Sequence, residues 1–186
     1  MQVILASASP RRKEILARIL PSFSVEPSGF DEHTVREREP SALVAALSRG
    51  KAEEVFARFP SAAVLAADTV VWFGGRALGK PKSKAEAAAT LRMLSGRRHA
   101  VYTGWCLLSP RGVRSGVCRS EVQFKELSEA FIAAYVAGGS PMDKAGSYGI
   151  QDDPSPVARC LGSFTNVIGL PQEEVAQAFK DIGILS

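Results

Sequence analysis

The chain has 186 residues, of which 46% are hydrophobic and 23% are charged, so it can bury a core as one large domain or two small lobes. Its formal net charge of +4 favours an anionic ligand but does not indicate DNA, because no long lysine–arginine stripe or aromatic array accompanies it. No apolar stretch approaches the roughly 20 residues that cross a bilayer, and no signal-peptide pattern opens the chain, so we expect a cytoplasmic protein.

The N-terminal segment predicts a strand followed at once by a helix. Residues 3–6 are apolar and predict a buried strand. Ser9 and Pro10 are typical of an N-cap and of the first helical position, and the helical pattern continues to Leu20.

The first turn of this helix carries Arg11, Arg12 and Lys13. Cations have the wrong sign at the positive end of a helix dipole, so we expect Arg12→Ala to leave the stability unchanged or slightly higher. A bound phosphate would reverse the balance, with Ser7 and Ser9 as additional hydrogen-bonding groups. The alternative is that Arg11, Arg12 and Lys13 are solvated surface residues that bind no anion.

The later elements alternate between strands and helices. Turn signals and periodicity first predict a strand at 23–27, a helix capped by Pro40-Ser41, a buried strand at 62–67 that runs directly into residues 68–72, and a hairpin turn at Gly74-Gly75. They then predict a helix opened by Ser83 and ending near Leu94, a hairpin at 99–124 around Pro110-Arg111-Gly112, and a helix from Ser128 to Gly138-Gly139. The last predicted elements are a strand at 157–161 and a helix at 172–179. This order predicts a mixed α/β fold with a cleft.

Asp68 ends the otherwise apolar strand that begins at Ala62, and active sites in open α/β folds commonly lie at strand ends. Because a buried, unpaired carboxylate is costly, Asp68 needs a metal, a cation or a role as a base, although a structural aspartate that holds a loop is an alternative. Glu32 lies beside Asp31 in a polar loop, and with Asp68 it can supply hard oxygen ligands to magnesium or manganese.

Two lysines and a glutamine are candidates for nucleotide contacts. Lys80 stands beside a proline at a strand-to-helix junction, from which it can reach a phosphate, and Lys51 lies within a helix. Each lysine alone is equally well explained as a surface residue. Gln151 ends the loop at 146–151, and its amide can donate to and accept from a nucleobase edge, with a plain turn as the alternative.

The cysteines and histidines predict no metal or nucleophile chemistry. Cys106, Cys118 and Cys160 are odd in number and fit no zinc module, so we expect reduced, structural thiols. His33 and His99 are too few for a zinc site and stand apart from any serine or cysteine nucleophile motif.

Taken together and in this order, several motifs resemble the Maf family of nucleoside triphosphate pyrophosphatases. They are L-A-S-A-S-P-R-R near the N-terminus, the pair Asp31-Glu32, A-A-D-T-V-V, G-K-P, L-S-G-R-R-H-A-V-Y-T-G, D-K-A-G-S-Y-G-I-Q and N-V-I-G-L-P. The resemblance implies one domain over residues 1–186, an elongated sheet flanked by helices, two lobes around a deep central cleft, an architecture related to inosine triphosphate pyrophosphatases, and often a homodimer.

The resemblance also assigns roles to single residues. It implies that Asp68 is the general base, that Glu32 and Asp68 hold a divalent metal cation (magnesium or manganese), and that the substrate contacts come from Ser7, Ser9, Arg11, Arg12, Lys51, Thr69, Lys80 and Gln151. Arg11, Thr69 and Gln151 fall where the family places its specificity residues.

Thr69 after Asp68, and a loop ending in Gln151, resemble the branch that converts dTTP and UTP to the monophosphate and pyrophosphate, with modified pyrimidine nucleotides as further substrates. After Gln151, residues 152–156 depart from relatives that are often richer in glycine. The alternatives are a 7-methyl-GTP pyrophosphatase of the same family and a non-catalytic nucleotide-binding regulator of cell division. A nucleic-acid-binding module is suggested only by the basic charge.

Overall fold

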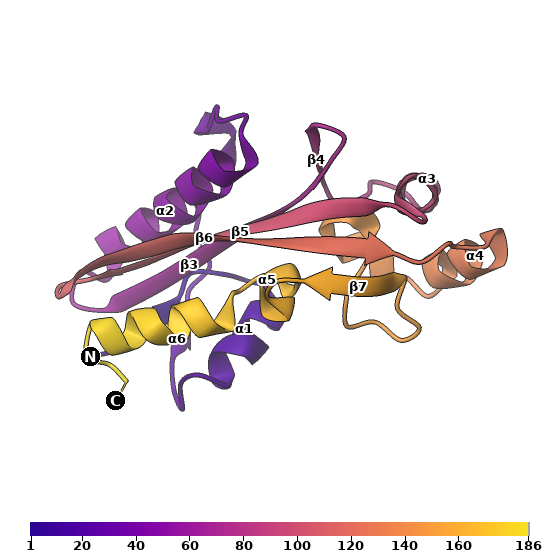
Figure 1. The fold of residues 1–186 in the computed structure, drawn as a ribbon. Helices are drawn as coiled ribbons and strands as arrows, with labels where there is room; N and C mark the ends of the chain where they lie inside the picture. The colour runs from indigo at the N-terminus through magenta and orange to yellow at the C-terminus, as the bar shows by residue number, and fades with distance from the viewer. Residues whose placement is uncertain (186) are drawn as a thin grey trace. The chain divides into compact units, whose positions relative to one another are not determined.

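The computed structural model describes residues 1–185 and has a mixed α/β architecture, as the sequence predicts (Figure 1). The strands are β1 (Val3–Leu5), β2 (Ser24–Val25), β3 (Ala63–Phe73), β4 (Arg76–Leu78), β5 (Arg98–Ser109), β6 (Gly112–Phe124) and β7 (Val157–Leu161). The α-helices are α1 (Pro10–Ala17), α2 (Pro40–Arg58), α3 (Lys84–Leu94), α4 (Glu129–Ala137), α5 (Phe164–Ile168) and α6 (Gln172–Asp181). Short 3-10 helices cover Glu32–Thr34, Ser140–Asp143 and Ala145–Ser147.

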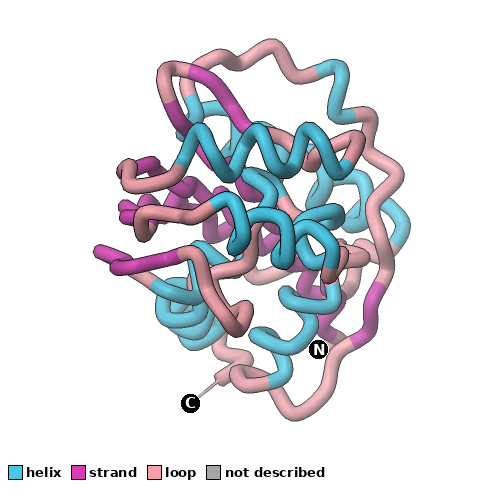
Figure 2. The backbone as a smooth tube through the Cα atoms, turned by 90° about the vertical axis from the view of Figure 1, so that its right-hand side faces the viewer, coloured by secondary structure: helices cyan, strands magenta, loops and turns pink. Residues whose placement is uncertain are grey.

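The strands, drawn in magenta in Figure 2, form one sheet in the order β2-β1-β3-β5-β6-β7, and β4 pairs with β3. β1 runs parallel to β2 and β3, whereas β4 and β7 run antiparallel to their neighbours. The chain divides into two compact units. The first comprises Met1–Thr69, Thr103–Cys118 and the segment from Gly169 onward, and the second comprises Val70–Tyr102 and Arg119–Ile168.

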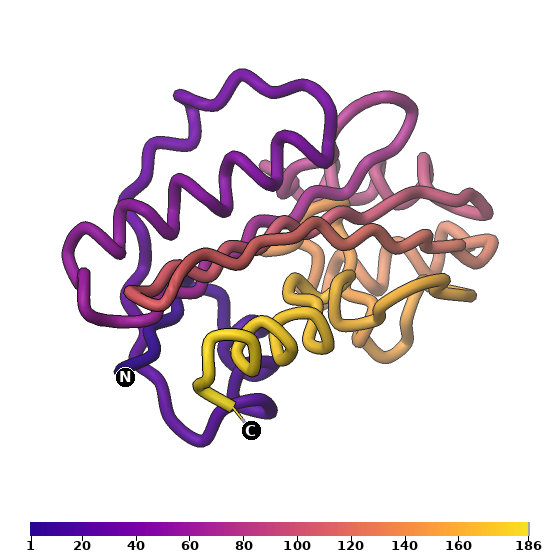
Figure 3. The backbone as a smooth tube through the Cα atoms, turned by 60° about the vertical axis from the view of Figure 1, so that its left-hand side comes forward, coloured from indigo at the N-terminus to yellow at the C-terminus, as the bar shows by residue number. Residues whose placement is uncertain are grey.

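In the first unit, α2 covers one face of the sheet, while α1 and α6 lie on the other (Figures 1 and 3). Consecutive side chains of a strand point to opposite faces, and β5 shows this directly. A methyl group added to Gly104 would stand 2.2 Å from the carbonyl oxygen of Val44 in α2. The indole of the next residue, Trp105, donates to Glu174 of α6 over 2.7 Å. Gly104 therefore permits β5 and α2 to approach closely.

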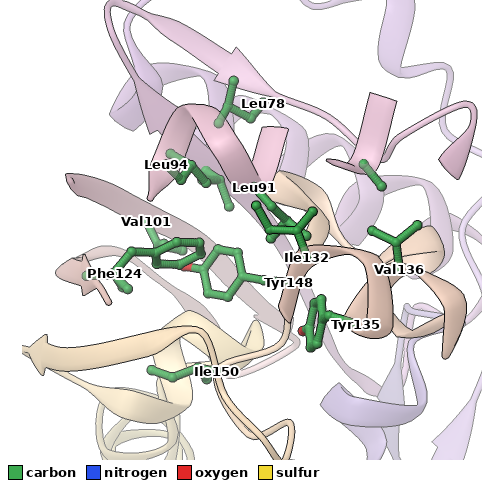
Figure 4. Close-up of a cluster of buried hydrophobic side chains, with 13 residues drawn as sticks. Leu78, Leu91, Leu94, Val101, Phe124, Ile132, Tyr135, Val136, Tyr148 and Ile150 are labelled. Atoms are coloured by element: carbon green, nitrogen blue, oxygen red, sulfur yellow. The ribbon is translucent and has the colours of Figure 1, made fainter. Parts of the chain in front are cut away.

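The second unit has its own apolar core, built from β5, β6, α3, α4 and the segment around residues 148–150 (Figure 4). The rings of Phe124 and Tyr148 meet edge to face, and the Tyr148 hydroxyl lies 2.7 Å from Nε2 of His99. Burial lowers the pKa of His99 to about 4, so this histidine is neutral at pH 7. His99 is thus a structural residue, as the sequence predicts.

Most predicted helix and turn signals are confirmed. The hydroxyls of Ser9, Ser83 and Ser128 each accept a hydrogen bond from the backbone N–H three residues later, as N-caps do. Gly74 and Gly75 both have positive φ angles in the turn between β3 and β4. These signals were readable because each depends on residues only a few positions apart.

Two predictions of helix ends were wrong, and one helix was missed. α1 ends at Ala17 rather than Leu20, because Leu20 precedes a proline, which disfavours helical backbone. The N-cap of α2 is Glu39, without a side-chain bond, so Ser41 does not cap this helix. The sequence also missed α5 (Phe164–Ile168), which is too short to show a helical period.

The three cysteines, Cys106, Cys118 and Cys160, are all free thiols, as expected. Burial raises the pKa of Cys106 to about 11, which keeps it protonated at neutral pH. None of the helices within residues 1–185 combines the length and apolar character needed to cross a bilayer.

Candidate functional site

Two neighbouring residues of β3, Asp68 and Thr69, carry two polar clusters of the first unit. Asp68 lies within β3 and not at its end, which corrects the sequence prediction. The Asp68 side chain contacts Lys51 of α2, whereas that of Thr69 contacts Arg12 of α1. Because adjacent strand residues point to opposite faces of a sheet, one strand supplies polar groups to both helices.

The first cluster consists of Glu32, Lys51 and Asp68, which we call the carboxylate cluster. The Lys51 ammonium nitrogen lies 2.5 Å from Oδ1 of Asp68 and 2.8 Å from Oε1 of Glu32. The side chains of Lys51 and Asp68 are only 14% and 16% exposed, whereas that of Glu32 is 55% exposed. One cation therefore balances two carboxylates, and Asp68 is the more enclosed of the two.

The loop that carries Glu32 is fastened to α2. The Ser28 hydroxyl and the Gly29 N–H donate to Oε2 of Glu54 over 2.8 and 2.9 Å. The ring of Phe30 lies on Gly50, where an added Cβ would come within 2.4 Å of it. Sequence reasoning missed these contacts, although a glycine inside a helical pattern, directly before Lys51, was a signal of close packing.

The second cluster is centred on Arg12, and we call it the arginine cluster. The Arg12 guanidinium donates from Nε to the Gly169 carbonyl over 2.9 Å, from Nη1 to the Ser7 hydroxyl over 3.3 Å, and from Nη2 to the Thr69 hydroxyl over 3.1 Å. The Thr69 hydroxyl also lies 2.9 Å from that of the buried Thr103. Arg12 therefore joins α1, β3 and the segment before α6, in addition to any ligand contact.

Charge and burial act on Arg12 in opposite directions. Burial has the largest effect and lowers the pKa of Arg12; the repulsion of Arg11 lowers it further, whereas the attraction of Asp68 and Glu32 raises it without reversing the shift. A guanidinium still keeps its charge at neutral pH. The two clusters are therefore close enough to interact electrostatically, and an anion would reduce the cost of holding Arg12 in this partly enclosed place.

Ser7 and Ser9 act as hydrogen-bond acceptors near the start of α1. Ser9 accepts from the Arg12 N–H over 3.4 Å, and Ser7 accepts from the Ser9 N–H over 3.2 Å. A hydroxyl that accepts in this way keeps its own proton available to a further acceptor such as a phosphate oxygen. Arg11 is half-buried in the same turn.

Lys80 and Gln151 belong to the second unit, so neither is part of the two clusters. Lys80 is exposed between β4 and α3, and Gln151 is exposed in a turn before β7. The structure thus brings together Ser7, Ser9, Arg11, Arg12, Glu32, Lys51, Asp68 and Thr69 in the first unit. The sequence did not indicate two hydrogen-bond partners in the arginine cluster: Thr103, which contacts Thr69, and the Gly169 carbonyl, which contacts Arg12.

The contacts of Arg12 reverse the expected effect of Arg12→Ala on stability. Truncation would remove three hydrogen bonds and leave the buried Gly169 carbonyl without this donor, which costs about 1–3 kcal/mol. The relief of a cation at a helix N-terminus is worth only about 0.3–1 kcal/mol. We therefore expect chemical denaturation of Arg12→Ala to show a lower free energy of unfolding.

Lys13→Ala is the matched control, because Lys13 is an exposed cation in the same helical turn. We expect it to be neutral or slightly stabilising, since only the dipole effect changes. If the two variants had equal stability, the Arg12 hydrogen bonds would contribute nothing to folding.

The mixed sheet, with a cationic helix N-terminus beside paired carboxylates, defines an α/β protein with a candidate site for an anionic ligand. The family model described as "Maf-like protein" matches residues 2–182, and the chain belongs to this family.

Similar proteins extend over nearly the whole chain. A "dTTP/UTP pyrophosphatase" of Syntrophus aciditrophicus is 47% identical, covering 100% of this chain and 92% of the relative. A protein of the same description from Moorella thermoacetica is 46% identical over 98% of this chain and 96% of its own. Among solved structures, a HAM1 protein from Coxiella burnetii aligns with a TM-score of 0.48 and 14% identity, covering 97% of this chain and 99% of that one.

Proposed function

We propose that this protein is a nucleoside triphosphate pyrophosphatase that hydrolyses dTTP and UTP at the α–β linkage. The names of its full-length relatives, at 47% and 46% identity, support the substrate class. The observation that supports hydrolysis of a phosphate linkage is the ion pair of Asp68 with Lys51, which lies in the same unit as the cationic start of α1.

Asp68 acts as the general base in this proposal. Its carboxylate accepts a proton from water as the water oxygen forms a bond to phosphorus and the bridging P–O bond breaks. The electron pair of the broken bond leaves with the bridging oxygen on pyrophosphate, so the products are a nucleoside monophosphate and pyrophosphate. Arg12, Lys51 and Lys80, with the hydroxyls of Ser7 and Ser9, bind the triphosphate by charge-assisted hydrogen bonds.

We also propose that the reaction uses magnesium or manganese. Within residues 1–185 no cluster of three or more potential metal ligands occurs, but Asp68 and Glu32 converge on the same ammonium nitrogen. Two carboxylates with substrate phosphates are a donor set that suits such cations. When bound there, the metal would neutralise phosphate charge and make a water more acidic.

The decisive experiment is a nucleotide panel. Pyrophosphate release would be measured from dTTP, UTP, ATP, GTP and 7-methyl-GTP with magnesium, with manganese and with a chelator. We expect the highest kcat/KM for dTTP and UTP and no release with the chelator. Preference for 7-methyl-GTP would reject the proposed substrate and keep the reaction, whereas no release from any nucleotide would reject the reaction itself.

Gln151→Ala tests the recognition of the base. The Gln151 amide can match the donor–acceptor pattern of uracil or thymine, and its loss leaves base groups unpaired at about 1–3 kcal/mol each. We therefore expect kcat/KM for UTP to fall clearly more than that for ATP. Gln177→Ala, at an exposed glutamine of α6, is the control. Equal losses for both nucleotides would remove Gln151 from base recognition.

A further inference from the structure

We propose that Asp152 is a positioning residue that fixes the turn carrying Gln151 and so sets the discrimination between pyrimidine and purine triphosphates. This inference rests on the proposed function, and it assigns a role to a residue outside the candidate site. In the sequence, residues 152–156 stood out only because relatives are often richer in glycine there.

One carboxylate oxygen of Asp152 receives three donors. The Tyr135 hydroxyl donates to Oδ2 in a very short hydrogen bond, the Ser140 hydroxyl donates over 2.6 Å, and the Gly149 N–H donates over 3.2 Å. The same Gly149 N–H lies 3.0 Å from the Tyr135 oxygen. Lys144 donates to the Ser140 hydroxyl over 2.9 Å and adds a positive charge to the network. Asp152 therefore ties α4 and the following 3-10 helix to the backbone of the turn.

The turn is also held on its N-terminal side. Tyr148 and Ile150 are buried in the core of the second unit (Figure 4). The Asp152 N–H donates back to the Gly149 carbonyl over 3.2 Å, which closes the turn. Gln151 is thus an exposed residue between a buried neighbour and a tethered one, so its backbone has little freedom.

Close packing within the turn makes this arrangement specific. A Cβ on Gly149 would come within 2.5 Å of Oδ1 of Asp152, so the carboxylate lies directly against the backbone. Asp152 also raises the pKa of Tyr135, in addition to the larger effect of burial, so the hydroxyl remains a proton donor. Because several donors hold the Asp152 carboxylate, the turn at residues 149–152 is ordered before the nucleotide binds.

Ordering before binding matters for specificity. Hydrogen bonds discriminate between bases only when the donor and acceptor are held in place, because a mobile amide must lose conformational entropy first and can adapt to the wrong base. The tether acts on Gln151 through the backbone and leaves the phosphate-binding residues of the first unit unchanged. Loss of Asp152 should therefore reduce selectivity more than it reduces the chemical step.

Truncation of Asp152 should be tolerated by the fold. Asp152, Tyr135 and Ser140 line a cavity of about 360 Å³ at the surface of the second unit. After truncation, water in this cavity can satisfy the hydroxyls that lose their acceptor. An effect on selectivity can then be separated from global unfolding.

The test compares Asp152→Ala with Asp153→Ala, its exposed neighbour in the same loop. For Asp152→Ala we expect kcat/KM for UTP to fall about tenfold, the effect of losing one hydrogen bond between the Gln151 amide and the base, mainly through a higher KM. The value for ATP should change little, so the UTP/ATP ratio falls. Amide hydrogen exchange should become faster in residues 148–152 and stay unchanged in α1. Asp153→Ala should resemble the wild type in both measurements.

A second variant keeps the test independent of folding. Tyr135→Phe removes one donor to Asp152 and keeps the aromatic ring, so we expect a smaller change in the same direction. In a double variant, Tyr135→Phe should add little to Asp152→Ala, because both residues act on the same turn.

The outcomes separate this inference from the proposed function. A wild type that prefers UTP, with an Asp152→Ala variant of the same UTP/ATP ratio, would overturn the inference alone. Equal losses of kcat for every nucleotide would show a structural role and would also overturn it. A wild type that releases no pyrophosphate would reject the proposed function and this inference with it.

Discussion

Replacement of Asp68 by asparagine is expected to lower kcat for pyrophosphate release from UTP by about 10²–10⁴, the usual contribution of a general base. Asparagine has nearly the same shape but its amide does not accept a proton from water. Lys51 keeps its ion pair with Glu32, so the variant loses one of the two carboxylates of the cluster while Lys51 stays paired. Steady-state kinetics and single-turnover measurements with UTP would show whether the chemical step is lost.

Asp31→Asn is the matched control for this variant. Asp31 is an exposed carboxylate that caps the 3-10 helix carrying Glu32, and asparagine can cap in the same way. We expect near-normal turnover and an unchanged thermal melt. Near-normal pyrophosphate release by Asp68→Asn itself would remove Asp68 from the mechanism.

Gly104→Ala is expected to cause the largest loss of stability among the variants considered. The added methyl group would stand 2.2 Å from the carbonyl oxygen of Val44 and 2.8 Å from the backbone nitrogen of Ala45. Both atoms belong to the backbone of α2, which cannot rotate away as a side chain can. We expect a cost of about 3 kcal/mol or more, the upper part of the range for overpacking, and a Tm lower by roughly 10 °C.

The same substitution should also impair the carboxylate cluster. Lys51 lies on α2, two helical turns after Val44, so displacement of α2 from β5 would move Lys51 away from Asp68. Gly29→Ala is the control, because an added methyl group meets nothing within 4 Å there. A Gly104→Ala variant with wild-type stability and activity would show that α2 and β5 are not held at this contact.

The position of α1 shows how much local sequence can predict. Ser9 and Pro10 identified the helix start, and the Arg12 N–H donates to the Ser9 hydroxyl as expected for an N-cap. The binding of an anion by the cations of this first turn stays a prediction. What the sequence could not give was the side-chain direction of Arg12, which contacts a carbonyl 157 residues away.

Other expectations still need an experiment. The homodimer, the cytoplasmic location, the deep cleft and the metal cofactor stay predictions. So do the contacts of Lys80 and Gln151 with the nucleotide.

The sequence by itself determined most of the elements, the serine caps of α1, α3 and α4, the family and the residue types that favour phosphate chemistry, because each of these depends on short spacings or on motifs that can be read in order. Only the tertiary structure decided that Asp68 lies within β3, that Arg12 supports Thr69 and Gly169, and that Asp152 is tied to Tyr135. These contacts join residues that are distant along the chain or lie on different elements. They form when packing brings the elements together, and neither periodicity nor propensity contains that information.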